Sequence, residues 1–365
     1  MKSKRKQIQT EIYMNQTNAL NQIVSPLLSW YGEHKRPLPW RDDPSPYHVW
    51  ISEIMLQQTR IEAVIPYYKR FLTELPDVAS LAAVDDDKLM KLWEGLGYYS
   101  RARNLKKAAL EIMERHGGKL PESAAELRAL SGIGDYTAGA IASISFGKPE
   151  PAVDGNVLRV IMRYLGKTDD IALQSTKKET SAALREIYPK GEDAKNLTQA
   201  IMELGESVCI PNGEPKCASC PLAALCKAKN ENLTDTIPVK SPKKPRKQEQ
   251  KTVFLLSCRG KYAVCKRPST GLLAKLWEFP NTQSRLTEEE AFAYLESLGL
   301  SPIAVTPCGD AVHIFTHIEW HMTGYAAECM TPSENFVWQG AEEIAEHYAI
   351  PSAFRAYTEY IKKLM

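Results

Sequence analysis

A proline-rich basic segment divides the chain and limits the folds that it can adopt. The segment IPVKSPKKPRKQEQK, residues 237–251, holds three prolines and six Lys or Arg residues but a single acid, Glu249. A stretch with so much proline and like charge cannot bury a core, so we predict an exposed linker over residues 231–250. The residue pattern differs on the two sides of this linker, which predicts two domains of different class.

The pattern before the linker is helical. In VLRVIMRYLG, apolar residues recur at i, i+3, i+4, i+7 and i+8 from Val157 to Leu165, which gives one buried stripe. The segments RARNLKKAALEIMERHGG and DAKNLTQAIMELG are similar, and the first of them stops at a double glycine. No alternating strand pattern of comparable strength precedes residue 230. We therefore predict an all-α domain over residues 19–230, after a basic tail over residues 1–18.

The pattern after the linker is mixed. Short apolar or alternating segments predict three strands, at KTVFLLSC, KYAVCKR and IEWHMTGYAAEC. Two other segments have helical patterns, TEEEAFAYLESLG and SAFRAYTEYIKKLM. We therefore predict a smaller α+β domain over residues 251–365.

Composition excludes several classes of protein. With 44% apolar and 25% charged residues the chain is not a disordered one, and no apolar run approaches the roughly 20 residues of a membrane span. The start, MKSKRKQIQTEIYMNQ, lacks the apolar run of a secretory signal, so we expect a cytoplasmic protein with reduced cysteines. The net charge of +2 is a poor guide to nucleic-acid binding, because basic residues gather in MKSKRK, SRARNLKK and KSPKKPRK.

Four of the eight cysteines fall within eighteen residues, spaced C-x7-C-x2-C-x5-C: Cys209, Cys217, Cys220 and Cys226. Four thiolates this close in sequence can bind Zn²⁺ or an iron–sulfur cluster, since both accept four cysteine ligands. The spacing is not the paired C-x2-C…C-x2-C of a zinc ribbon, which favours a [4Fe–4S] cluster. Four thiols without a metal in one short loop would be a liability.

The segment ALSGIGDYTAGAIASISFG predicts a helix, a tight turn and a second helix over about residues 128–145. Gly132 and Gly134 flank Ile133, so the backbone can take positive φ while one apolar residue fills the core. The N–H groups at the start of the second helix could bind a DNA phosphate without reading base sequence. An ordinary helical hairpin with a glycine turn is the alternative.

Asp154 in PAVDGNVLRV is the first of two acidic residues that could do chemistry. It lies at the predicted N-cap of a helix, where the helix dipole and nearby N–H groups favour the ionised carboxylate. A carboxylate fixed in that state could stabilise a positively charged sugar. A plain capping role is the alternative.

Glu53 is the second candidate. Trp50, Glu53, Ile54, Gln57 and Gln58 fall on one predicted helical face. A carboxyl among apolar side chains is partly desolvated, which raises its pKa and lets it keep a proton. A surface Glu whose apolar neighbours face away is the alternative. A carboxylic acid and a carboxylate together form the pair that cleaves glycosidic bonds.

Taken together, these segments resemble the adenine DNA glycosylases of the MutY family. KRPLPWR, WISEIMLQQTR, GLGYYSRARNL, LSGIGDYTAGAI, VDGNVLRV and the cysteine loop occur in the family's order, and the resemblance extends from about residue 20 to the end. It implies a helix-hairpin-helix glycosylase domain of two helical subdomains with a [4Fe–4S] cluster, then a Nudix-like domain. It also implies removal of adenine mispaired with 8-oxoguanine or guanine in double-stranded DNA, in base excision repair. We expect a nucleoid-associated monomer.

The resemblance also implies roles for individual residues. Glu53 would protonate the adenine ring and Asp154 would support the oxocarbenium-like sugar, with Asn156 and Arg41 beside them. The remaining residues would contact DNA. The duplex would be contacted by Leu56, Gln57, Gln58, Tyr98, Gly132 and Gly134, and its phosphates by Arg101 and Arg103. The 8-oxoguanine would be contacted by Phe315, Thr316 and His317.

The chain departs from related patterns at three places. Tyr136 occupies the position where relatives similar to endonuclease III carry a lysine for Schiff-base chemistry, which predicts a monofunctional enzyme with Tyr136 steadying the transition state. GLLAKLWEFPN resembles the segment before a Nudix box, but the diphosphatase signature is not preserved, which predicts recognition and not hydrolysis. The cysteine loop has seven residues between its first two cysteines, one more than is usual in the family.

Two alternatives stay open from the sequence. One is a bifunctional glycosylase/lyase similar to endonuclease III, against which Tyr136 argues. The other is a non-catalytic iron–sulfur DNA-binding protein, against which the intact pair of Glu53 and Asp154 argues.

Overall fold

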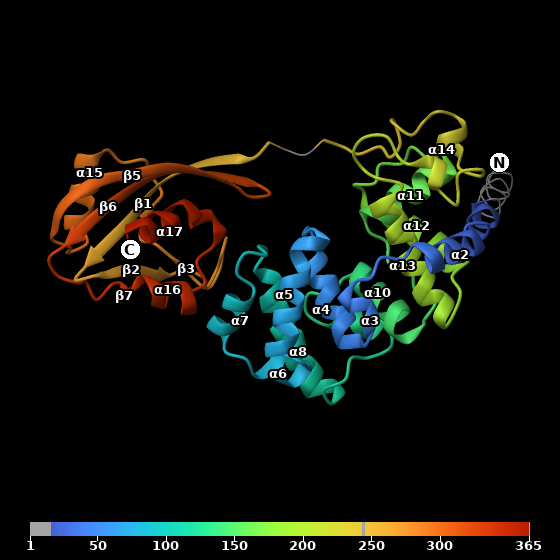
Figure 1. Cartoon of the computed structure of the whole chain (residues 1–365), viewed down its shortest axis with the longest axis horizontal. Coiled ribbons are helices and arrows are strands. Elements are labelled where there is room, and N and C mark those ends of the chain that lie inside the picture. Colours follow the sequence, from blue (N-terminus) through green and yellow to red (C-terminus); the bar gives the residue numbers. More distant parts are fainter. Residues whose placement is uncertain (1–15, 243–244, 365) are drawn as a thin grey trace, which may run out of the picture. The chain divides into compact units, whose positions relative to one another are not determined.

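The computed structural model of the chain describes residues 16–242 and 245–364 (Figure 1). Most of the predicted basic tail, residues 1–15, lies outside the described residues, as do residues 243–244 of the predicted linker. Across the described ranges, no helix has the length and apolar character needed to cross a membrane.

Contacts divide the chain into two compact units: unit 1 is Met1–Ala82 with Asn104–Pro242, and unit 2 is Ala83–Arg103 with Lys243–Met365. The sequence prediction differs, because it assigned residues 83–103 to the helical domain. These residues group with the C-terminal ones through polar contacts that no local pattern contains. Asp87 accepts a hydrogen bond from the Lys266 ammonium at 2.8 Å, and Glu94 accepts one from the backbone N–H of Ile350 at 2.9 Å.

Unit 1 is helical, as predicted. Its elements are α2 (Val24–His34), α3 (Pro39–Asp42), α4 (Pro46–Leu56), α5 (Ile61–Glu74), α6 (Val78–Ala83), α8 (Ser100–His116), α9 (Ala124–Ala129), α10 (Asp135–Phe146), α11 (Gly155–Leu165), α12 (Gln174–Arg185), α13 (Glu192–Ser207), η1 (Cys217–Ser219) and α14 (Lys227–Asn230). The end of α6 and the start of α8 fall in unit 2. The sequence predicted α8, α10, α11 and α13 from their patterns but not α12.

Helix α10 is central to unit 1, because it packs against α4, α9 and α13. Its residues from Thr137 to Ile144 are all buried, and most of them are small. Gly139 allows the chain to pass very close, since a Cβ there would lie 2.4 Å from the carbonyl oxygen of Pro151. The site described below lies among these packed helices.

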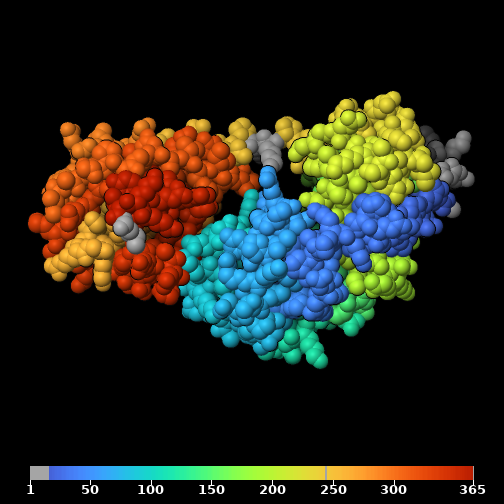
Figure 2. All heavy atoms as spheres, viewed as in Figure 1, coloured from blue at the N-terminus to red at the C-terminus, as the bar shows by residue number. Residues whose placement is uncertain are grey.

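A hydrophobic core joins the N-terminal helix α2 to the helices around the cysteine loop. Leu27 of α2 packs in this core with residues of α11, α12 and α13, such as Val160, Leu184 and Leu204. In Figure 2 the blue surface of α2 adjoins the yellow-green surface of these later helices. Three of the clustered cysteines pack against the same core: Cys209, Cys220 and Cys226.

Unit 2 is a mixed sheet with helices, which agrees with the predicted α+β class. Its seven strands follow the order β3-β2-β1-β6-β5, with β4 paired to β1 and β7 to β2. Only the pair of β1 and β6 is parallel among the described strands. The elements are α7 (Asp86–Leu92), β1 (Lys247–Cys258), β2 (Lys261–Lys266), β3 (Trp277–Glu278), β4 (Asn281–Thr282), α15 (Glu288–Ser297), β5 (Pro302–Ile314), β6 (Ile318–Cys329), β7 (Val337–Gln339), α16 (Ala341–His347), η2 (Ser352–Phe354) and α17 (Arg355–Leu364).

Strand β1 is buried on both faces. Val253 and Leu255 point into a core that includes residues of α16 and α17, whereas Phe254 and Leu256 point into a second core with α15. The predicted strands β1, β2 and β6 and helices α15 and α17 are confirmed. The strand β1 begins at Lys247, so it takes up the last four residues of the segment predicted as linker.

Candidate active site

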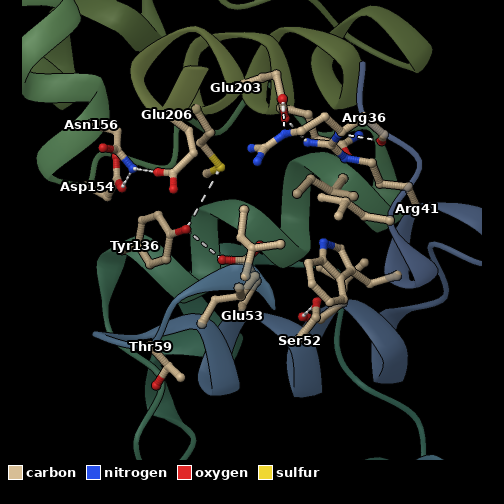
Figure 3. Close-up of a pocket in the computed structure, with 18 residues that line it drawn as sticks. Arg36, Arg41, Ser52, Glu53, Thr59, Tyr136, Asp154, Asn156, Glu203 and Glu206 are labelled. Carbon is tan, nitrogen blue, oxygen red and sulfur yellow. Dashed lines mark hydrogen bonds and ion pairs between the residues drawn. The ribbon is translucent and has the colours of Figure 1, made fainter. Parts of the chain in front are cut away.

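Helices α4, α10, α11 and α13 contribute side chains to a cavity of about 150 Å³ in unit 1 (Figure 3). The five residues predicted as catalytic all line it: Arg41, Glu53, Tyr136, Asp154 and Asn156. They come from segments that are far apart in the sequence, and the packing around α10 brings them together. Their catalytic roles stay predictions.

Glu53 lies in the wall of this cavity, with 6% of its surface exposed. Burial raises the pKa of Glu53 to about 7, and the charge of Asp154 adds to the increase, while the Tyr136 hydrogen bond and the charge of Arg41 oppose it. A carboxyl with such a pKa is protonated in about half of the molecules at neutral pH, as a general acid requires. The predicted burial is confirmed, and the surface alternative is wrong.

Tyr136 contacts Glu53 directly. Its hydroxyl donates a hydrogen bond to Glu53 Oε2 at 2.6 Å and lies 3.9 Å from the sulfur of Met202 (Figure 3). Burial, with the nearby charge of Glu53, raises the pKa of Tyr136 well above its usual value, so the hydroxyl keeps its proton. The side chain can therefore orient the acid, but it has no amine with which to form an imine.

Asp154 caps α11 as predicted, and it accepts a hydrogen bond from the backbone N–H of Val157 at 2.8 Å. The Asn156 side-chain amide donates a second bond to it at 3.0 Å. Burial nevertheless raises the pKa of Asp154, although hydrogen bonds from the backbone N–H groups of Val157 and Asn156 and the charge of Arg159 lower it. The sequence argument expected a net stabilisation of the ionised form; it counted the cap and the dipole but not the desolvation.

A buried arginine links this aspartate to the cysteine loop. The guanidinium of Arg159 donates to the side-chain oxygen of Asn156 at 2.8 Å, and to the carbonyl oxygens of Gly205 and Cys209 at 2.7 Å each. Gly205 also permits close packing, since a Cβ there would lie 2.7 Å from the Cβ of Asn156. The position of the Asp154 cap therefore depends on contacts made by α13 and the loop after it.

The other side of the cavity holds an ion pair that the sequence did not reveal. Glu203 of α13 is buried, and both of its oxygens are bonded, one to Arg36 and the other to the Arg41 guanidinium at 2.7 Å (Figure 3). Arg41 also donates to the carbonyl oxygen of Arg36 at 2.8 Å. The position of Glu203 on the buried stripe of a predicted helix resembles the pattern that singled out Glu53, but that pattern does not identify the arginines that pair with it.

The residues after Glu53 depart from the prediction. Helix α4 ends at Leu56, and Gln57 and Gln58 form a turn in which Gln58 has a φ of 58°. They therefore do not continue the helical face on which the sequence placed them; the four residues after Leu56 are all polar, and the next helix, α5, begins at Ile61. The Gln57 amide reaches the hydroxyl of Thr137 at 3.4 Å.

A larger cavity of about 930 Å³ adjoins the first one. Glu53, Tyr136 and Asp154 line both of them. The larger cavity is also lined by the turn residues Gln57 and Gln58, by Gly134, and by three basic side chains of α12, which are Lys177, Lys178 and Arg185. The lining also includes the acids Asp135 and Glu150, and Glu150 is paired with Arg185 at 2.9 Å, so the groove that leads to the carboxyl pair carries charges of both signs. The α12 residues were missed, because QSTKKETSAALR combines basic residues with no recognisable motif.

The helix-hairpin-helix turn borders the same groove. Gly132 has a φ of 77°, and Ile133 is buried as predicted. Gly134 has a φ of −92°, so the prediction of positive φ holds at Gly132 alone. Gly134 is the N-cap of α10 and has no side chain with which to cap it, so the first N–H groups of the helix remain available to a phosphate.

Arg101 is not a phosphate contact. It is 7% exposed, and its guanidinium donates to the carbonyl oxygens of Leu96 and Gly97 at 3.0 and 3.1 Å. Arg103 donates to the carbonyl oxygen of Ala274 at 2.9 Å. The sequence prediction for Arg101 is therefore wrong, because a basic residue at the start of a helix gives no sign that its side chain folds inward.

In unit 2, Phe315, Thr316 and His317 form the turn between β5 and β6. Thr316 and His317 are exposed, whereas Phe315 is half-buried. Tyr98 has a φ of 47°, and its hydroxyl forms a hydrogen bond of 3.0 Å with the hydroxyl of Thr316. Two segments predicted separately as DNA contacts thus meet within one unit.

The four clustered cysteines line one small cavity of unit 1. Arg163 anchors the loop there, because its guanidinium donates to the sulfur of Cys209 at 3.4 Å and to the carbonyl oxygens of Ile210, Thr234 and Ile237. Within the described ranges, no three His, Cys, Asp or Glu side chains are close enough to hold a single metal ion. Four thiols around one cavity nevertheless fit a cluster whose iron atoms each take one thiolate.

Known proteins are similar in sequence to both parts of the chain. Residues 51–190 match the model of the HhH-GPD superfamily base excision DNA repair proteins, and residues 252–360 match the NUDIX domain. The adenine DNA glycosylase of Rattus norvegicus is 32% identical, over 92% of this chain and 77% of that protein. The chain belongs to the adenine DNA glycosylase family. Its likeness to the Buchnera aphidicola (subsp. Acyrthosiphon pisum) member is 31% identity over 92% of this chain and 97% of that protein.

A solved structure supports the fold of the glycosylase's first domain. A non-covalent complex of endonuclease III with DNA is 25% identical, with a TM-score of 0.51 over 60% of this chain and 98% of that one. The predicted family is confirmed, and so is the predicted fold of a helix-hairpin-helix domain followed by a Nudix-like one. The protein is therefore a DNA-binding glycosylase of base excision repair.

Proposed function

We propose that this glycosylase hydrolyses the N-glycosidic bond of adenine mispaired with 8-oxoguanine, and also with guanine, in double-stranded DNA. The carboxyl pair is the main support, because Glu53 with a pKa of about 7 and the helix cap Asp154 line one cavity. The adenine DNA glycosylases with 31–33% identity support the choice of base. One chain carries all the residues of the cavity, so we also propose that it acts as a monomer.

Binding begins with the DNA backbone. The N–H groups at the start of α10 and the basic side chains Lys177, Lys178 and Arg185 bind phosphates, which gives a salt-sensitive and sequence-independent affinity. The bond to be cut is inaccessible in a stacked pair, so the adenine has to leave the duplex. It enters the smaller cavity from the groove that the basic side chains line.

Inside the cavity, Glu53 donates its proton to the adenine ring, which makes the base a better leaving group. The Tyr136 hydroxyl holds Glu53 in place at 2.6 Å. Positive charge develops on the sugar as the bond lengthens, and the ionised carboxylate of Asp154 offsets that charge. Water then completes the hydrolysis.

The bonded group of Arg36, Arg41 and Glu203 gives the far side of the cavity a fixed pattern of N–H donors and carboxylate oxygens. The edge of adenine carries both donors and acceptors, so this pattern can fix the orientation of the flipped base. Tyr136 cannot form an imine, which makes strand cleavage by the lyase route unexpected.

We further propose that Cys209, Cys217, Cys220 and Cys226 hold a [4Fe–4S] cluster. The cluster would be structural, since hydrolysis of a glycosidic bond moves no electrons. Arg163 and Arg159 both bond the loop that carries the cysteines, so the cluster would fix the loop beside the Asp154 cap. Purified protein should show broad visible absorption and contain iron; zinc in its place would contradict the assignment.

A single-turnover assay tests the activity. Duplexes carrying adenine opposite 8-oxoguanine, guanine or cytosine are compared, and we expect adenine release chiefly from the first. Glu53→Gln should abolish release, whereas the exposed-site control Glu62→Gln should not change it. Unchanged excision by Glu53→Gln would refute the assignment of the acid. Strand nicking before any alkali treatment would favour the bifunctional alternative.

A further inference from the structure

The turn formed by Phe315, Thr316 and His317 is bonded to the end of the linker. The Arg246 guanidinium Nε donates a hydrogen bond of 3.0 Å to the carbonyl oxygen of Phe315. The next residue, Lys247, donates its backbone N–H to the carbonyl oxygen of His317, also at 3.0 Å. The last residue before β1, Arg246, and the first residue of β1, Lys247, thus hold the two ends of a three-residue turn.

This contact follows from the one parallel pair among the described strands. Strand β1 enters the sheet beside β6, with Lys247 opposite Ile318, and eleven residue pairs continue the register as far as Ser257. In Figure 1 the linker runs into β1 alongside the β5–β6 hairpin. An antiparallel hairpin tip normally extends past its sheet with no neighbour. Here the first residues of β1 are its neighbour.

The underside of the turn is held by aromatic packing. The ring of Phe315 lies 4.8 Å from that of Trp320 and 4.5 Å from that of His313, edge to face in both cases. Trp320 is 2% exposed and has the ammonium of Lys251 at 4.5 Å from its ring centre. Phe315 therefore points inward, and the exposed Thr316 and His317 are the residues presented outward.

We propose that Arg246 and Lys247 are positioning residues for recognition of the base opposite adenine. They hold the backbone of the turn, so that Thr316 and His317 meet that base in one geometry. The inference rests on the proposed function, in which this turn reads 8-oxoguanine. It assigns to the linker a part in substrate selection, besides its joining of the two units.

Two variants remove one bond each. Arg246→Met removes the side-chain donor from an exposed position, where folding is not at risk. Lys247→Pro removes the backbone N–H, and Lys247→Ala is its matched control, since it shortens the side chain but keeps that N–H. Arg259→Ala removes a different exposed arginine, in the turn after β1 at its other end.

The readout is the ratio of single-turnover excision rates for adenine opposite 8-oxoguanine and opposite guanine. We expect Arg246→Met and Lys247→Pro to lower this ratio about three- to tenfold, the size of one net hydrogen bond, with little change in the rate opposite guanine. The ratio should be unchanged in Lys247→Ala and Arg259→Ala. Hydrogen exchange of the turn amides should rise in the first two variants only.

The possible failures are distinct. An unchanged ratio in both Arg246→Met and Lys247→Pro would overturn the inference while leaving the proposed function intact. Equal loss on both duplexes, with a reduced salt dependence of binding, would make Arg246 a phosphate contact and would also overturn it. If the unaltered protein showed no preference for 8-oxoguanine, the proposed specificity itself would fail, and the positioning role with it.

Discussion

Replacing Glu53 by Gln should stabilise the protein while it abolishes catalysis. In the unfolded chain this carboxyl has its usual pKa of 4.5, and burial in the folded state raises the pKa to about 7. The folded state therefore binds the proton more tightly, so its stability is greatest below pH 4.5 and declines as the pH rises to about 7. Above that pH, the enzyme carries a buried charge that Gln does not have.

The size of the effect follows from the two pKa values. Each pKa unit is worth about 1.4 kcal/mol, so the increase from 4.5 to about 7 costs the folded state about 3 kcal/mol at pH 8 and about 1 kcal/mol at pH 5. The amide oxygen of Gln can still accept the hydrogen bond from Tyr136, so that bond is kept.

Thermal unfolding at the two pH values measures this directly. For a domain of this size, about 3 kcal/mol corresponds to an increase of roughly 6–12 °C in Tm. We expect Glu53→Gln to raise Tm by that amount at pH 8 and much less at pH 5, while the exposed-site control Glu62→Gln raises it at neither. Equal stabilisation at both pH values, or none at pH 8, would refute the claim that a charge is forced into the cavity wall.

Three further predictions concern other residues of unit 1. Tyr136→Phe removes the hydrogen bond that lowers the pKa of Glu53. In a pH–rate profile, the pH above which excision declines should therefore rise by about one unit. An unchanged profile would contradict the role of that bond. Gly132→Ala places a Cβ 2.6 Å from a neighbouring side chain at a φ of 77°. It should lower the free energy of unfolding, measured by urea titration, by about 1–3 kcal/mol. The control Gly134→Ala places a Cβ that meets nothing within 4 Å, so its stability should be unchanged. Arg159→Met removes the link between the cysteine loop and the Asp154 cap, and should lower both the excision rate and the iron content; an unchanged excision rate would show that the link is not needed.

Local patterns were enough to predict the carboxyl pair. Glu53 stands among apolar residues at helical spacing, and Asp154 directly precedes a helix with one continuous apolar stripe, so each signal lies within about ten residues. The strands β1, β2 and β6 were predictable for the same reason, because each is a run of apolar or alternating residues that are adjacent in the sequence. The secondary structure of a segment is largely determined by the residues within that segment.

The contacts of a side chain depend on residues that are distant in the sequence. Glu203 was missed because its partners, Arg36 and Arg41, lie 167 and 162 residues away in the sequence. Arg101 was assigned to DNA because its charge is visible in the sequence and its burial is not. The expected lowering of the pKa of Asp154 erred in the same way, since a cap can be inferred from spacing but the loss of water around the carboxyl depends on the whole fold.

Gly205 shows how a residue without functional groups can determine activity. Any side chain at this position would press on Asn156, which donates to the Asp154 cap, although Gly205 itself has nothing with which to touch DNA. A genetic screen for loss of repair should therefore recover substitutions here alongside those of the two acids. The chemistry of the substituted side chain alone would not explain such alleles, whereas their cause would be a displacement of Asp154, the aspartate that we propose stabilises the sugar.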